Sequence, residues 1–188
     1  MMVFQGTWPF ISTERFINPD KTYEVSDELE SLFFVLLYEG IHWVAHNKPP
    51  MLDVKFIFDD VQVNANGHQT GGRGKFWMYI QSANVILKEL EFEKSPPFTG
   101  LIRELFRLFE SLAVVNMYEG TDRKPGDRDV ANVNKLKSCR VVVLLMKKAV
   151  GRVDWSEEHD KVPDDNYPRR EEIDTVVQIF PRGYSWYG

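Results

Sequence analysis

The chain has 188 residues, of which 43% are hydrophobic and 13% aromatic, so it can bury one sizeable core. Its formal net charge of -5 argues against general affinity for nucleic acid, because such binding needs a basic face. The single cysteine, Cys139, excludes an internal disulfide and favours an intracellular protein, with cytoplasm and nucleus both open. The N-terminus has no basic segment followed by an apolar run, so we expect no secretory signal.

Residues 1–25 contain turn formers and scattered aromatic side chains. They predict an ordered loop with one helical turn near Ser12–Phe16. Loops this aromatic usually dock on a core, so we expect Trp8, Phe10 and Phe16 to be buried.

The stretch 26–46, SDELESLFFVLLYEGIHWVAH, predicts a buried central helix. Asp27 is the expected N-cap, and Glu30 follows three residues later, as in a capping box. Apolar residues cover nearly the whole circumference, which is typical of a buried helix. Glu39 and His42 interrupt the apolar run, so the helix is not expected to span a membrane. Prolines at 49 and 50 end it.

The middle of the chain is less regular. Residues 51–63 fit either a short helix or an extended run, and 64–72 predict a flexible loop rich in glycine and asparagine. Apolar spacing predicts a second helix over 75–92, which Ser95-Pro96-Pro97 ends.

A third helix is expected over 99–118 and a fourth over 130–150. The run Val141 to Met146 is β-branched at its start, but the pattern on both sides favours helix over strand. After Gly151 the composition predicts a solvated, charged tail with an apolar end at 173–188 that docks or binds a partner. We therefore divide the chain into a domain over 1–150 and a tail over 151–188.

The glycine cluster at 67–75 does not fit a phosphate-binding loop. Gly74 and Lys75 match the end of the Walker pattern, but its first glycine would fall at Gln69 and its hydroxyl at Phe76. We interpret the cluster as a surface loop, and no nucleotide or other cofactor is expected.

No catalytic or metal site is expected from the other polar residues. His42 and His46 share the spacing of helical zinc ligands, but the glutamate of that motif is absent, so structural histidines are favoured. Cys139 has no activating base nearby in the pattern, and a core thiol is the default. The acids Asp59 and Asp60 are interpreted as a solvated loop.

Two stretches together resemble a known family. Residues 6–14, GTWPFISTE, look like the end of a protein-kinase activation segment, G-T-x-x-F-[MI]-[AS]-x-E. Residues 27–38, DELESLFFVLLY, look like the D-D-L-E-S-L-x-Y-V-L-x-Y form of the long buried helix in the kinase C-terminal lobe. The combination resembles the fungal-type protein kinase family. The resemblance implies a mainly helical fold, the lower half of a kinase C-lobe packed around one central buried helix.

The resemblance also implies roles for particular residues. Thr7 would lie where the substrate-binding loop approaches the catalytic loop, and Trp8 to Ile11, with Phe10, would line the pocket beside the phosphoacceptor. Glu14 would match the glutamate that pairs with an arginine of the lobe, with Arg103 and Arg140 as candidates. The aspartate that holds the catalytic loop corresponds to Glu28, although a shift of one residue would let Asp27 serve.

The groups that perform phosphoryl transfer are missing from the sequence. A kinase needs a glycine-rich loop, a strand lysine, a catalytic aspartate and a metal-binding aspartate, all before the activation segment. Only five residues precede Gly6, and no H-R-D-type or D-F-G-type motif follows. We therefore expect a truncated gene model or a remnant of a serine/threonine-type kinase that is inactive alone. The alternatives are a non-catalytic helical module whose residues 4–14 and 173–187 bind a protein or peptide, and a helical protein with a chance match.

Overall fold

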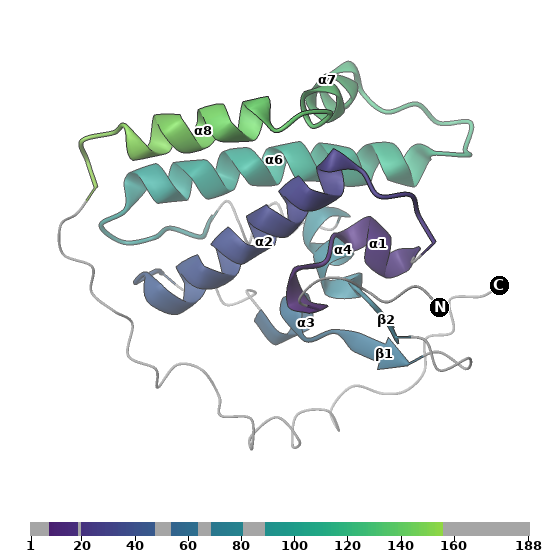
Figure 1. Cartoon of the computed structure of the whole chain (residues 1–188), viewed down its shortest axis with the longest axis horizontal. Helices are drawn as coiled ribbons and strands as arrows, with labels where there is room; N and C mark the ends of the chain where they lie inside the picture. Colours follow the sequence, from purple (N-terminus) through teal and green to yellow (C-terminus); the bar gives the residue numbers. More distant parts are fainter. Residues whose placement is uncertain (1–7, 19, 48–53, 64–68, 81–88, 156–188) are drawn as a thin grey trace.

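The computed structural model describes residues 8–18, 20–47, 54–63, 69–80 and 89–155, and there the chain is mainly helical, as predicted (Figure 1). The elements, in chain order, are η1 (Trp8–Phe10), α1 (Thr13–Ile17), α2 (Val25–Trp43), α3 (Val54–Phe58), β1 (Val61–Val63), β2 (Gln69–Gly71), α4 (Arg73–Ile80), α6 (Pro96–Tyr118), α7 (Asp127–Lys135) and α8 (Arg140–Val150). Within the described ranges no helix is long and apolar enough to cross a membrane.

The predicted central helix is confirmed as α2. It crosses α6 on one side, and α1 and η1 contact it on the other (Figure 1). Three of its side chains, Phe33, Phe34 and Leu37, are completely buried. The prediction of its start was wrong, because the N-cap is Glu24 and Asp27 is the third helical residue, where its carboxylate accepts the Glu24 backbone N–H at 2.9 Å. Asp27 is thus the third helical residue of a capping box, whose side chain bonds back to the N-cap backbone.

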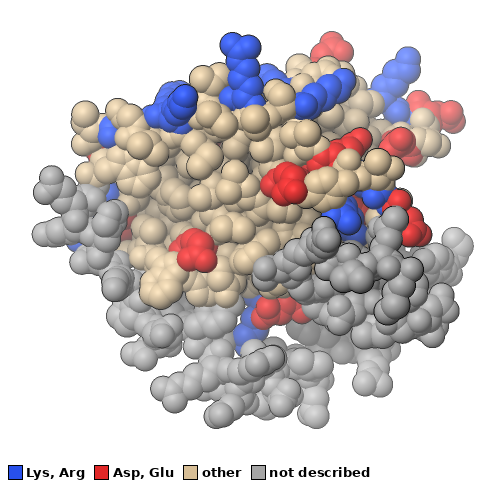
Figure 2. Space-filling view, in the orientation of Figure 1, with Lys and Arg blue, Asp and Glu red and all other residues tan. Residues whose placement is uncertain are grey.

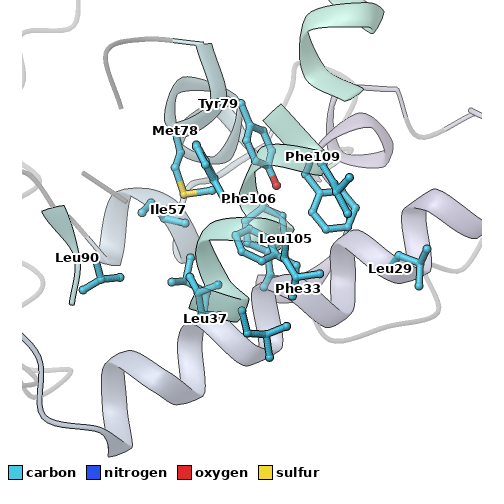
Figure 3. Close-up of a cluster of buried hydrophobic side chains, with 14 of the residues drawn as sticks. Leu29, Phe33, Leu37, Ile57, Met78, Tyr79, Leu90, Leu105, Phe106 and Phe109 are labelled. Atoms are coloured by element: carbon cyan, nitrogen blue, oxygen red, sulfur yellow. The ribbon is translucent and has the colours of Figure 1, made fainter. Parts of the chain in front are cut away.

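Aromatic side chains from three helices form the core around α2 (Figure 3). The rings of Phe33 and Phe109 lie 5.5 Å apart between α2 and α6. Tyr79 of α4 stacks on Phe106 of α6, also at 5.5 Å. Because each large apolar side chain contributes about 1.5–3 kcal/mol on burial, this cluster is the main force that joins α2, α4 and α6.

For residues 51–63 the sequence left a short helix and an extended run open, and the structure contains both. Residues 54–58 are helical, whereas 61–63 pair antiparallel with 69–71. The predicted helix over 75–92 is wrong at both ends. It begins at Arg73, and Phe92 instead forms an antiparallel bridge with His46. Residues 81–88 lie outside the described part of the chain.

The C-terminal helices form a layer in which α7 and α8 pack on α6 (Figure 1). Pro96 and Pro97 occupy the first turn of α6, where a missing N–H costs nothing, so this helix starts earlier than predicted. The single helix expected over 130–150 is two helices, since the chain turns at 136–139. The turn buries both Leu136 and Val142, each only 1% exposed.

The expected tail is described only as far as Trp155. Its indole N–H donates to the Ala149 carbonyl at 2.7 Å, so the chain folds back on the end of α8. The charged and apolar segments predicted beyond it lie outside the described residues.

Candidate functional site

Two carboxylates near the start of α2 hold residues 12 and 13 against the central helix. Ser12 Oγ donates to Asp27 Oδ1 at 2.8 Å. Thr13 donates twice to Glu30, from its backbone N–H at 3.1 Å and from Oγ1 at 2.7 Å. Asp27 and Glu30 are three residues apart, which places both on one face of a helix. Residues 12 and 13 are therefore bonded directly to α2.

Asp27 rather than Glu28 is the buried acid at this helix start. Asp27 is 3% exposed, and both of its carboxylate oxygens lie 2.9 Å from Lys21 Nζ. Glu28 is exposed. Of the two acids proposed for the anchoring place, Asp27 thus has the burial and the bonds that an anchor needs.

A buried lysine approaches the same segment from α4. Lys75 is 1% exposed, and its ammonium donates to the Ile11 carbonyl at 2.7 Å. The ammonium also lies over the rings of Phe34 and Phe16, 4.3 and 4.6 Å from their centroids. Lys and Arg side chains otherwise stand at the surface of the face seen in Figure 2, where water solvates them.

Burial perturbs the titration of the three groups that meet here. It lowers the pKa of Lys75 to about 7, although the negative charge of Glu30 opposes the shift. Burial raises the pKa of Glu30, while bonds from Thr13 and the charge of Lys75 act in the other direction. Burial and the Glu30 charge together raise the pKa of Tyr79 well above its ordinary value. The Tyr79 hydroxyl is buried beside the Glu30 carboxylate.

A loop aspartate and a glycine set the position of Lys75. Asp60 Oδ2 accepts the backbone N–H groups of Arg73 and Gly74, at 2.8 and 3.4 Å, and so caps the start of α4. Gly74 packs directly on the α3 backbone, since a Cβ built there would lie 1.8 Å from the Phe56 carbonyl oxygen. The residue before Lys75 therefore has to be glycine.

No family model, curated protein or solved structure matches the chain. The resemblance to a kinase family accordingly stays a prediction from the two sequence motifs.

The residues proposed to line the substrate pocket are only partly described. Thr7 and the side chain of Trp8 lie outside the described residues. Phe10 is half-buried, with its ring edge-on to Tyr38 at 5.3 Å. Ile11 is buried and offers its carbonyl to Lys75.

The arginine that would pair with Glu14 stays a prediction. Glu14 is half-buried in the first turn of α1. Arg103 donates to the Leu90 carbonyl at 3.1 Å and lies 3.4 Å from Glu91, and Arg140 is exposed at the start of α8.

The two histidines and the cysteine considered as site residues take no part in this site. A ring nitrogen of His42 bonds the Tyr38 carbonyl, and one of His46 bonds the Ile41 carbonyl. Among the described residues, no three His, Cys, Asp or Glu side chains are grouped to hold a metal. Cys139 is exposed at the turn before α8, so the prediction of a core thiol was wrong. The prediction placed Cys139 inside one continuous helix over 130–150, whereas the chain turns at this position.

Sequence patterns missed the residues that make this site. The patterns place Lys75 in a glycine-rich cluster and at the start of a helix, Glu30 in a cap and a helix motif, and Asp60 in a solvated loop, but they do not bring the three together. A usable signal existed for Asp60, because an aspartate close to a helix start often accepts its free N–H groups. The arrangement is sealed from solvent, so chemically it can hold a backbone segment in place rather than act on a substrate.

Proposed function

We propose that the chain is the lower part of a fungal-type protein-kinase C-lobe, with residues 6–14 as the end of its activation segment, and that it has no kinase activity alone. One observation carries the proposal. The two motifs that resemble the family bond to each other through Ser12–Asp27 and Thr13–Glu30, at 2.8 and 2.7 Å. A chance match of two separate stretches would give no reason for these contacts.

The surroundings of α2 also support the proposal. The resemblance implies that this helix is the buried axis of the lobe, and Phe33, Phe34 and Leu37 are completely buried in it. The later helices pack around it, with α6 crossing it and α4 against α6.

The sequence contains none of the groups that position ATP and its metal, so the transition state of phosphoryl transfer would have no stabilising charges. We expect no phosphorylation when the pure chain is incubated with radiolabelled ATP, Mg²⁺ and a mixed protein substrate. Metal-dependent incorporation above a boiled control would contradict the proposed inactivity.

A domain swap tests the lobe assignment itself. Residues 6–150 would replace the corresponding part of an active fungal-type kinase, and the chimera would be assayed for solubility and phosphorylation. A matched chimera carrying Asp27→Asn should lose stability, while one carrying Glu28→Gln should not. If the chimera aggregates while the same swap from another kinase of the family is active, the assignment is wrong.

The alternative is a non-catalytic module that binds a protein or peptide. It is favoured by apolar side chains exposed around α1, where Ile17 and Tyr23 are about half exposed, at 51% and 49%. Tyr23, in the segment between α1 and α2, lies against Arg15 of α1, with the guanidinium 4.7 Å from the ring centroid. If this alternative holds, a peptide library should shift the amide resonances of residues 13–17, and an Ile17→Ser variant should weaken that shift.

A further inference from the structure

Lys75 is the buried charged group that the motif resemblance does not explain. We propose that Lys75 and Glu30 are positioning residues that clamp residues 11–13 on the central helix, so that a peptide partner meets this segment in a preset conformation. The inference rests on the proposed function in one respect, since it takes residues 8–13 to be the peptide-facing stretch.

The clamp consists of two side chains that hold one short backbone segment from different elements. Glu30 of α2 accepts the Thr13 N–H at 3.1 Å, and Lys75 of α4 donates to the Ile11 carbonyl at 2.7 Å. A backbone donor and a backbone acceptor two residues apart are thus satisfied by side chains rather than by a regular helix or sheet. Both side chains are almost fully buried, at 2% and 1% exposure, so neither can leave its partner for water without local opening.

A purely structural role explains this arrangement poorly. Burying an ammonium and a carboxylate costs free energy that apolar side chains of similar volume would not cost. Apolar residues at 30 and 75 could fill the same space against Phe16 and Phe34, but they could not fix the direction of a carbonyl or an N–H. Directional bonds to residues 11 and 13 are what these two polar side chains add.

Protonation should tune the clamp. The groups that face Lys75 are Glu30 on α2, the Phe16 and Phe34 rings and the Ile11 carbonyl, and Tyr79 on α4 acts on Glu30. Local opening that exposes Lys75 to water would return its pKa from about 7 toward 10.5. Opening is therefore coupled to proton uptake, and the clamp should tighten as the pH rises above 7.

Amide hydrogen exchange of Thr13, followed by NMR on the full chain, tests the clamp. Lys75→Met removes the donor to the Ile11 carbonyl, and Glu30→Gln removes the charge of the group that accepts the Thr13 N–H. Each is expected to speed Thr13 exchange about 10- to 100-fold. Ser111→Ala is the control, because Ser111 is buried in α6 and bonds Asp129 and Asn132 rather than this segment. Because Thr13 exchanges through local opening, Ser111→Ala should leave the rate of Thr13 exchange itself unchanged.

The pH profile separates positioning from simple loss of stability. In the wild-type chain, Thr13 exchange should rise less than the ordinary tenfold per pH unit above pH 7, and Lys75→Met should restore the ordinary slope. If Thr13 and Leu105 accelerate by the same factor in both variants, the clamp is refuted. Should either single variant fail to fold, the double variant Lys75→Met/Glu30→Gln removes both charges and must still exchange Thr13 rapidly.

These measurements use the chain alone, so they are independent of the domain swap. Fast Thr13 exchange in the variants together with a failed swap would keep the clamp and reject the kinase assignment. Unchanged Thr13 exchange together with an active swap would reject the clamp and keep the kinase assignment.

Discussion

The buried Lys75 predicts an unusual dependence of stability on pH. Its pKa is lowered from 10.5 to about 7 in the folded chain, chiefly by burial. Between those values the unfolded chain binds a proton at Lys75 that the folded chain does not bind. The free energy of unfolding therefore rises with pH across this window.

The size of the effect follows from the shift. The shift sets a ceiling of about 5 kcal/mol on the stability change over the whole range, and of about 2–3 kcal/mol between pH 7.5 and 9.5. Glu30 titrates together with Lys75, so the observed steps belong to the pair. Because the pKa of Glu30 is raised, its own contribution to stability falls as pH rises from 4.5 toward its folded value. The two contributions have opposite signs, and the rise above neutrality comes from Lys75.

Urea unfolding followed by circular dichroism, at several pH values from about 6 to 9.5, measures this curve. The background variant Cys139→Ser removes the exposed thiol, so that no intermolecular disulfide forms during the alkaline incubations. The series stops at 9.5 because burial and Glu28 raise the pKa of Tyr23 to about 12, so Tyr23 begins to lower stability near pH 10.

Two variants decide whether Lys75 is responsible. Lys75→Met should flatten the rise between pH 7.5 and 9.5. Glu30→Gln removes the charge that opposes the shift, so the rise should begin at a lower pH than in the wild type. A wild-type curve that coincides with the Lys75→Met curve would refute the assignment of a neutral, buried lysine.

Three further predictions concern the surrounding structure. Gly74→Ala should destabilise the chain by about 3 kcal/mol, because the new Cβ meets the Phe56 carbonyl. Gly100→Ala has open space around it and should stabilise α6 by up to about 1 kcal/mol. Equal effects of the two variants in urea titrations would contradict this. Asp27→Asn should cost about 3 kcal/mol and the exposed Glu28→Gln less than about 0.5, and the reverse order in thermal melts would make Glu28 the anchor. Ser111→Ala should cost about 1–3 kcal/mol in the same melts by breaking its bond to Asp129, and no change would remove that bond as a link between α6 and α7.

Sequence patterns predicted the elements that neighbouring residues determine, through local propensity or through a long stretch of regular apolar spacing. The central helix, the turn at α1 and the helical state of Val141–Met146 are confirmed. Phe16 is buried as expected, at 3% exposure. In each case the residues that decide the structure are neighbours in the chain, so propensity and periodicity carry the information.

Other features depend on partners far away in the chain. The break between α7 and α8 places Leu136 and Val142 in the core, and no single helix sets two residues six apart on one face. The spacing of these two residues could have indicated the break, but the long run of good helix formers around them favours a single helix. The start of α6 at Pro96 was readable too, from the preference of proline for the first helical turn.

The candidate site was the least predictable part. Lysine is normally a surface residue, and the carbonyl that Lys75 bonds lies 64 residues earlier in the chain. No local pattern around Gly74 marks such a contact. Its glycine and lysine instead imitate a phosphate loop, although the glycine is required by contact with α3 and the lysine by a buried carbonyl.

The burial of Asp27 and Glu30 changes how the kinase-like motif is interpreted. In the stretch DELES, the two acids that contact the activation-like segment are the first and the fourth letters, and the second, Glu28, faces solvent. Ser31 donates to the Asp27 carbonyl at 2.9 Å, so the last letter braces the same helical turn. The start of α2 therefore presents two carboxylates to the start of α1, where Ser12 and Thr13 supply two hydroxyls. Loss of either hydroxyl would leave a buried carboxylate short of a donor, which costs more than an exposed substitution would.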